Sequence, residues 1–322
     1  MSPARPDAAR ADRSAALEGE LSLAPFYGPR YWATWALLGL MHLAARLPPR
    51  WQQRLGRSLG RVVRRLKRRE HGVARRNFEL CFKELDAAER QALLERHFES
   101  VGMSFVEMGI GWFTPIERLL ARVTIVGREH LDAALARGKG ALLFTAHFTT
   151  LEVGVAVLEA LAPNCSCMYR PQRNAMMDMM IRRGRHRFAR EQIPRDNVRA
   201  LLRNLHDNYA VVYLPDQTYL GKQSELLPFF REPAVTNTAT GKLAAISGAA
   251  VLPYFFRRLP NGDYRVDIGP PLEGLPSESP TRDTQRLFAA LEEYIRLAPE
   301  QYLWLYKKFK GRPPPFSDPY AR

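Results

Sequence analysis

From about residue 123 onward, short runs rich in β-branched and apolar residues alternate with longer stretches of helical periodicity. The predicted strands are residues 123–126, 141–146, 166–169, 211–214, 250–256 and 264–268. The predicted helices are residues 151–161, 176–190, 197–206, 238–246 and 282–297. Such alternation is typical of α/β folds, so the pattern predicts a central sheet flanked by helices.

The length of the chain allows a large hydrophobic core, and its few cysteines argue against a disulfide framework and a zinc site. With 322 residues, 46% of them hydrophobic, it can form one large α/β domain or two small ones. Cys81, Cys165 and Cys167 are too few for a disulfide framework and favour a reducing, cytoplasmic setting. Their spacing does not match a zinc site, and we expect no metal.

Positive charge is concentrated in one part of the chain. Lys and Arg number 48 against 33 Asp and Glu, which gives a formal net charge of +15. Twelve of these basic residues lie between Arg46 and Arg76, where Glu70 is the only acidic residue. Such an excess points to a polyanionic partner, for which nucleic acid and an anionic membrane surface both qualify.

An apolar segment, residues 31–47, directly precedes this basic region. It begins with Tyr31, Trp32 and Trp35, which suit a membrane interface, but it is short for a bilayer of about 30 Å. Behind it, apolar residues at three- and four-residue spacing predict an amphipathic helix with Arg on its other face; they are Trp51, Leu55, Leu59, Val62, Val63 and Leu66. We expect a membrane anchor at 31–47, spanning or interfacial, and a basic helix on anionic headgroups. A solvated charged face is the alternative.

The predicted organisation has five parts. Residues 1–30 form a flexible leader, 31–47 the anchor, 48–120 a basic helical region, 121–312 the α/β domain and 313–322 a tail. Acidic residues before the apolar run, such as Asp12 and Glu20, argue against a cleavable signal peptide. Near the end of the α/β domain, Tyr302, Trp304 and Lys308 belong to an aromatic and basic mixture that suits either a headgroup boundary or a buried strand.

The strand predicted at 141–146 ends directly in His147, with Glu152 five residues later at the start of a helix. Polar residues at the carboxyl end of a strand are where α/β folds place ligands. If His147 lies in the turn and Glu152 in the first helical turn, the carboxylate can orient the imidazole as a general base. Thr149 and Glu152 also match a capping box, in which Glu152 would only cap the helix.

Several segments of the chain together resemble one enzyme family. They are Arg30-Tyr-Trp-Ala-Thr-Trp35, Arg76-Asn-Phe-Glu-Leu-Cys-Phe82, Phe98-Glu-Ser-Val-Gly-Met103, His147-Phe-Thr-Thr-Leu-Glu152, Tyr169-Arg-Pro171, Arg183-Gly-Arg185, Pro215-Asp216, Gly248-Ala249, Val251-Leu-Pro253, Ala298-Pro-Glu-Gln-Tyr302 and Lys308-Phe-Lys310. In this order, from about residue 30 to 312, the chain resembles the bacterial late acyltransferases of lipid A biosynthesis, of lauroyl type. These belong to the glycerolipid acyltransferase superfamily, whose His-x4-Asp/Glu signature His147 and Glu152 match.

The resemblance implies a mixed sheet of the glycerolipid acyltransferase type and a defined reaction. A lauroyl-type chain would move from acyl carrier protein to a hydroxyl of Kdo-lipid IV(A), at the cytoplasmic face of the bacterial inner membrane. His147 would deprotonate the hydroxyl, Glu152 would orient His147, and backbone N–H groups or a nearby cation would stabilise the oxyanion. No cofactor and no covalent nucleophile are implied, and Cys165 and Cys167 are expected to be core residues.

The resemblance also suggests substrate-binding residues. Arg183 matches the Arg-Gly-Arg element, where a guanidinium could hold a phosphate or carbonyl oxygen, and Arg170 follows the strand at 166–169. Asp216 stands where related enzymes carry a Pro-Glu-Gly-Thr-Arg block, but no Arg follows it here. We therefore expect Asp216 to pair with Arg183 or another active-site cation; a structural turn residue is the alternative.

Two other functional classes remain open from the sequence. A related phospholipid or glycolipid acyltransferase would use the same chemistry on a different acceptor. A basic nucleic-acid-binding protein would also carry excess charge, but the basic residues adjoin an apolar segment and no nucleic-acid motif is present. The expected partners are acyl carrier protein, a lipid A precursor and an anionic membrane surface, and not nucleic acid.

Overall fold

The computed structural model describes residues 22–172, 174–186 and 191–321. Most of the predicted leader, residues 1–30, lies outside these residues. The same is true of the last four residues of the helix predicted at 176–190.

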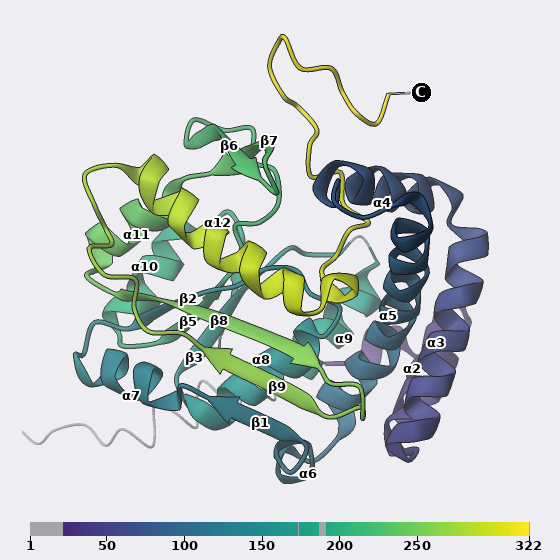
Figure 1. The fold of residues 1–322 in the computed structure, drawn as a ribbon. Helices are drawn as coiled ribbons and strands as arrows, with labels where there is room; N and C mark the ends of the chain where they lie inside the picture. The colour runs from purple at the N-terminus through teal and green to yellow at the C-terminus, as the bar shows by residue number, and fades with distance from the viewer. Residues whose placement is uncertain (1–21, 173, 187–190, 322) are drawn as a thin grey trace, which may run out of the picture.

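A mixed sheet forms the centre of the molecule (Figure 1). Within the described residues it has seven strands in the order β1-β9-β8-β2-β5-β3-β4. They are β1 (Val123–Val126), β2 (Ala141–Phe144), β3 (Cys165–Tyr169), β4 (Glu191–Pro194), β5 (Ala210–Tyr213), β8 (Ala250–Arg258) and β9 (Tyr264–Ile268). The run from β8 to β4 is parallel, whereas β9 pairs antiparallel with β8 and parallel with β1. The predicted α/β fold and its mixed sheet are confirmed.

Strand β4 and one hairpin were not predicted from the sequence. The hairpin consists of β6 (Ser224–Phe229) and β7 (Glu232–Asn237), which pair antiparallel apart from the main sheet. Pro228 and Pro233 lie opposite each other in it. Proline cannot donate a ladder hydrogen bond, so it weakens the strand pattern in the sequence.

Helices cover both faces of the sheet, as the alternating side chains of β8 show. Phe255 stacks on Tyr294 of α12, with ring centroids 4.7 Å apart. Tyr254 points to the other face, where its hydroxyl donates to the backbone carbonyl of Gly154 in α8 at 2.7 Å. The helices around the sheet are α7 (Arg128–Ala136), α8 (Leu151–Leu161), α9 (Ala175–His186), α10 (Val198–His206), α11 (Ala239–Ser247) and α12 (Pro280–Leu297).

The N-terminal helices form a layer beside the sheet, packed around the long helix α5 (Figure 1). They are α2 (Trp32–Arg46), α3 (Pro49–Leu66), α4 (Arg68–Cys81) and α5 (Ala87–Phe113) itself; the short helix α6 (Ile116–Leu120) packs instead on α8 and β1. Helix α5 begins with a complete capping box between Asp86 and Glu89. Among the described residues, no helix combines the length and the apolar character needed to cross a bilayer. The membrane anchor at 31–47 stays a prediction.

Helix α3 packs on α5 through small residues. Cβ atoms at Gly60 and Gly102 would each lie within 2.2 Å of the backbone of the other helix, so only glycine permits this approach. With Gly56 and Gly60 buried against α5, the apolar stripe of α3 is left exposed; it consists of Trp51, Leu55, Leu59, Val62 and Leu66. We call this set the α3 stripe. Basic side chains of the same helix, among them Arg54 and Arg57, are exposed beside it.

After α12 the chain returns to the centre of the molecule. Tyr302, Trp304, Lys308 and Phe309 are buried, and Phe148 forms an antiparallel bridge with Tyr302. These four members of the aromatic and basic mixture are therefore core residues and do not form a headgroup boundary, whereas Tyr306, Lys307 and Lys310 are half-buried.

Candidate active site

His147 and Asp216 meet because they follow neighbouring parallel strands. Strands β2 and β5 are paired in register, with Phe144 opposite Tyr213, and His147 and Asp216 each lie three residues beyond this pair. The carboxyl ends of parallel strands lie at the same edge of a sheet, so both turns open there. The backbone N–H of Thr145 donates to the carbonyl of Tyr213 at 3.0 Å and extends the pairing toward the two turns.

The carboxylate of Asp216 holds both the imidazole and the backbone of His147. Nδ1 of His147 lies 2.7 Å from Oδ1 of Asp216, and the backbone N–H of His147 donates to Oδ2 at 3.1 Å. The Asp216 side chain is 2% exposed, whereas that of His147 is 30% exposed. The carboxylate is thus buried behind an imidazole that is partly exposed to solvent.

The pKa values follow from this pairing. Burial lowers the pKa of His147, but the charge and hydrogen bond of Asp216 outweigh burial and raise it above its ordinary value; Arg185 opposes this rise. Burial alone would raise the pKa of Asp216, but His147 and Lys308 hold it below the ordinary range. Asp216 is therefore an ionised acceptor, and Nδ1 of neutral His147 carries the proton.

Glu152 does not contact His147, contrary to the expectation from the sequence. Its carboxylate accepts from Nε of Arg185 at 3.2 Å, from Nη2 of the same residue, and from Nε1 of Trp112 at 3.1 Å. Within the described residues no hydrogen bond joins Glu152 to His147. Glu152 lies in the first turn of α8 and faces α9 and the end of α5, while the position beside Nδ1 is taken by Asp216.

The capping-box alternative for Glu152 is not formed either. The N-cap of α8 is Thr150, whose side chain makes no cap hydrogen bond. The hydroxyl of Thr149 instead lies 2.8 Å from that of Ser100 in α5. Glu152 is thus an ion-pair residue: burial would raise its pKa, but Arg185 and Trp112 outweigh burial and lower it.

Arg185 of the Arg-Gly-Arg element pairs with the buried carboxylate of Glu152. Its side chain is 15% exposed, and its charge acts on both Glu152 and His147. Arg183, the expected substrate-binding residue, is exposed, as is Arg170. Asp216 pairs with His147 and not with Arg183, although a pairing with a cationic group was expected.

Burial disfavours the cysteines as nucleophiles. Cys165 and Cys167 of β3 are 1% and 2% exposed, as expected of core residues. Burial raises the pKa of Cys167, which keeps its sulfur in the unreactive thiol form.

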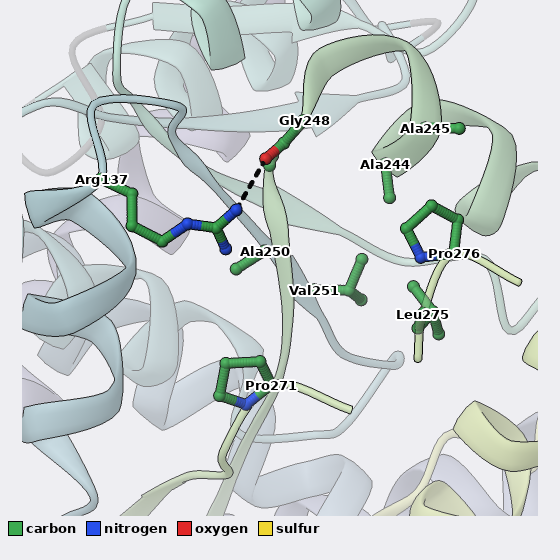
Figure 2. Close-up of a pocket in the computed structure, with 10 residues that line it drawn as sticks. Arg137, Ala244, Ala245, Gly248, Ala250, Val251, Pro271, Leu275 and Pro276 are labelled. Carbon is green, nitrogen blue, oxygen red and sulfur yellow. Dashed lines mark hydrogen bonds between the residues drawn. The ribbon is translucent and has the colours of Figure 1, made fainter. Parts of the chain in front are cut away.

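A pocket of about 240 Å³ lies at the other end of the sheet (Figure 2). Ala250 and Val251, at the amino end of β8, line it, and Arg137 reaches toward the carbonyl of Gly248 beside them. Because β8 and β2 are parallel, this pocket is at the edge opposite to His147. It is therefore not part of the site formed by His147 and Asp216.

The buried ion pair gives a first prediction. Glu152→Leu leaves the Arg185 charge buried without its partner, so we expect a loss of about 3–5 kcal/mol in the free energy of unfolding. Adding Arg185→Met removes the unpaired charge and should recover more than half of the loss. Urea unfolding of both variants measures this. Equal stability of the single variant and the unmodified protein would show that the pair contributes nothing to the fold.

Comparison with known proteins shows the family to which the chain belongs. The sequence profile of the bacterial lipid A biosynthesis acyltransferases matches residues 24–311. The chain is 36% identical over 287 residues to the lipid A biosynthesis lauroyltransferase of Escherichia coli (strain K12), covering 88% of this chain and 94% of the relative. It is also 36% identical over 290 residues to the palmitoleoyltransferase of that strain, covering 89% and 94%. With the myristoyltransferase of the same strain it shares 26% over 303 residues, covering 92% and 93%.

The matched region begins before α2 and ends after the buried C-terminal segment, so it contains both turns of the site and the helices packed beside them. The partly exposed imidazole on a buried carboxylate thus lies within the matched part of the chain. This protein is an acyltransferase and belongs to the bacterial lipid A biosynthesis acyltransferase family.

Proposed function

We propose that this enzyme transfers a lauroyl-type chain from acyl carrier protein to a hydroxyl of Kdo-lipid IV(A), with His147 as the general base. The observation that carries the proposal is the His147 imidazole, 30% exposed and held at 2.7 Å by the buried carboxylate of Asp216. Membership of the lipid A acyltransferase family supports the acceptor. The lauroyltransferase and the palmitoleoyltransferase are both 36% identical to this chain, so the assay below is designed to determine the length of the transferred chain.

In this mechanism His147 first takes a proton from the acceptor hydroxyl and later gives it to the leaving sulfur. Asp216 accepts the hydrogen bond from Nδ1–H, which leaves the lone pair of Nε2 to take the proton of the acceptor hydroxyl. The hydroxyl oxygen attacks the thioester carbonyl and forms a tetrahedral intermediate. When the C–S bond breaks, the imidazolium returns the proton to the leaving sulfur. The products are an ester and a free thiol, and His147 is neutral again.

Two charges develop in this reaction, on the imidazolium and on the oxyanion, and each requires a group of opposite charge nearby. The buried Asp216 carboxylate stabilises the imidazolium. Arg185, whose charge acts on His147, is the cation that we assign to the oxyanion, with Glu152 holding its guanidinium in place. Glu152 thereby acts on the reaction through Arg185 and not through the base.

The acceptor and the donor are tested together with purified protein. We expect a fast transfer from lauroyl-acyl carrier protein to Kdo-lipid IV(A), and slower transfer from palmitoleoyl- and myristoyl-carrier protein, followed by mass spectrometry of the lipid. The same donor with lysophosphatidic acid tests the alternative of a phospholipid acceptor. Faster transfer to lysophosphatidic acid than to Kdo-lipid IV(A) would contradict the proposed acceptor.

Exposed apolar side chains on α3 and α2 support docking on an anionic membrane surface. The α3 stripe is exposed along its length, from 36% at Leu59 to 74% at Leu66. Leu40 and Leu43 of α2 are 64% and 60% exposed. Exposed arginines flank the α3 stripe, so the surface combines apolar side chains for the acyl boundary with positive charge for phosphate headgroups. We expect these helices to lie in the interface.

Membrane docking gives a second prediction. Replacing Leu55 and Leu59 by serine removes two apolar side chains from the α3 stripe and should weaken vesicle binding about tenfold or more. Ile246→Ser with Leu297→Ser is the matched control, because these residues are 61% and 62% exposed on α11 and α12. Flotation with vesicles of mixed phosphatidylcholine and phosphatidylglycerol measures both. Equal binding of the two double variants would place the docking surface elsewhere.

A further inference from the structure

The C-terminal segment after α12 is hydrogen-bonded to the turn that carries His147. The backbone N–H of Leu303 donates to the carbonyl of His147 at 2.8 Å, and the N–H of Thr149 donates to the carbonyl of Gln301, also at 2.8 Å. Residues 301–303 therefore fix the backbone of the turn from His147 to Thr149, on either side of Phe148. We call residues 301–309 the C-terminal strap.

The same strap holds the aspartate. The Tyr302 hydroxyl donates to Oδ2 of Asp216 at 3.0 Å, and Nζ of Lys308 donates to the backbone carbonyl of Asp216 at 2.7 Å. Both strap side chains are buried, Tyr302 at 4% exposure and Lys308 at 2%. The Lys308 ammonium lies about 5 Å from the rings of Phe229 and Phe288. A lysine amino group is almost never buried to this extent without a partner that fixes it.

These contacts leave the carboxylate of Asp216 one orientation. Oδ2 is occupied by the His147 backbone N–H and by the Tyr302 hydroxyl, while Oδ1 faces Nδ1 of His147. A carboxylate held at both oxygens cannot rotate away from the imidazole. The Tyr302 hydroxyl also donates a hydrogen bond to this carboxylate and partly offsets its negative charge. Asp216 therefore stabilises a protonated His147 less than it would without Tyr302.

We propose that Tyr302 is a positioning residue for acyl transfer, acting on His147 through Asp216, with Lys308 holding the backbone of the same aspartate. This inference rests on the proposed function of His147 as general base. It assigns a role in the reaction to a segment that lies far from His147 in the sequence, and whose side chains do not touch the reacting atoms.

Tyr302→Phe tests the proposal because it removes only the hydroxyl. We expect kcat to fall about tenfold, the effect of one hydrogen bond to a charged group, with little change in KM. Without this donor the Asp216 charge acts more strongly on His147, so the acid limb of the kcat profile should move to higher pH. The other charged groups that face the pair, Arg185 and Lys308, are unchanged in this variant.

Tyr306→Phe is the matched control. It belongs to the same strap, but its hydroxyl donates to the carbonyl of Thr218 at 3.3 Å and not to Asp216. We expect the rate and the acid limb of this variant to equal those of the unmodified enzyme. A merely structural role for Tyr302 would lower activity and stability without moving the acid limb.

A titration of His147 by NMR in protein with ¹⁵N-labelled histidine separates this inference from the proposed function, because it needs no substrate. The midpoint should rise in Tyr302→Phe and stay unchanged in Tyr306→Phe. Lys308→Met, which keeps the aliphatic stem, should raise the midpoint as well and serves if Tyr302→Phe does not fold. An unchanged midpoint together with an unchanged rate would overturn the role of Tyr302, even if the unmodified enzyme transfers acyl chains. Absence of transfer by the unmodified enzyme would instead overturn the proposed function.

Discussion

His147→Ala should lower the rate of acyl transfer by about 10²- to 10⁴-fold, the usual contribution of a general base. The acceptor hydroxyl is then deprotonated only by water, while the carboxylate of Asp216 and the charge of Arg185 remain. The rate is measured under single turnover with acyl carrier protein thioester, so that product release does not mask the chemical step.

The control for this variant is its stability. Asp216 loses one donor but keeps others, so the removal of His147 should cost less in the free energy of unfolding than Glu152→Leu does, and urea unfolding should show a folded protein. The removal does leave the buried carboxylate of Asp216 with Tyr302 and the backbone N–H of residue 147 as donors. A folded His147→Ala protein with substantial activity would contradict the general-base role.

Asp216→Asn is expected to lower the rate on the order of 10³-fold, because an amide can donate to Nδ1 and favour the tautomer in which Nε2 carries the proton. The acid limb should also move. The pKa of His147 is raised by Asp216 above its ordinary value, and transfer requires the neutral imidazole. Loss of the negative charge therefore lowers the pKa, and the limb shifts to lower pH, opposite to the shift expected for Tyr302→Phe.

Glu152→Gln distinguishes the role of the Glu152 carboxylate from that of the Asp216 carboxylate. This residue contacts Arg185 and Trp112, so its neutral variant should leave the acid limb near its original pH or move it slightly lower, since the Arg185 charge is then less compensated. If Glu152→Gln lowered the acid limb as far as Asp216→Asn does, Glu152 would be the partner of His147, and the assignment of Asp216 would be wrong.

The sequence was informative about elements and about His147, because both depend on local pattern. The helix bounds at Leu151–Leu161 and the strand bounds at Val123–Val126 were predicted as the structure has them. His147 was identified because it directly follows an apolar strand. The element bounds and the position of His147 after a strand can be predicted from residues that are close together in the sequence.

The partner of His147 could not be predicted in the same way. It depends on the order of strands in the sheet: the neighbours of β2 are β5 and β8, and neither follows β2 directly in the sequence. Periodicity shows that Asp216 follows a strand, but not that this strand lies beside β2. Glu152, only five residues from His147, was the nearer candidate, and its direction is set by Arg185 on a different helix.

Helix α3 shows a similar limit. Its apolar residues predict an amphipathic helix, but the face that packs on the protein is decided by Gly56 and Gly60, which fit α5 because Gly102 faces them. Glycines on one face of a helix do not identify that face as a packing surface until the partner helix is known. The outward direction of the α3 stripe therefore became visible only in the structure.

The central claim is most directly tested by mass spectrometry of lipid A from a bacterial host that lacks its own lauroyltransferase. Expression of this chain should add the mass of one secondary acyl chain to the lipid A of the host, and expression of the His147→Ala variant at the same level should add none. Lipid A that keeps its unacylated mass while the unmodified, folded protein is present would contradict the account.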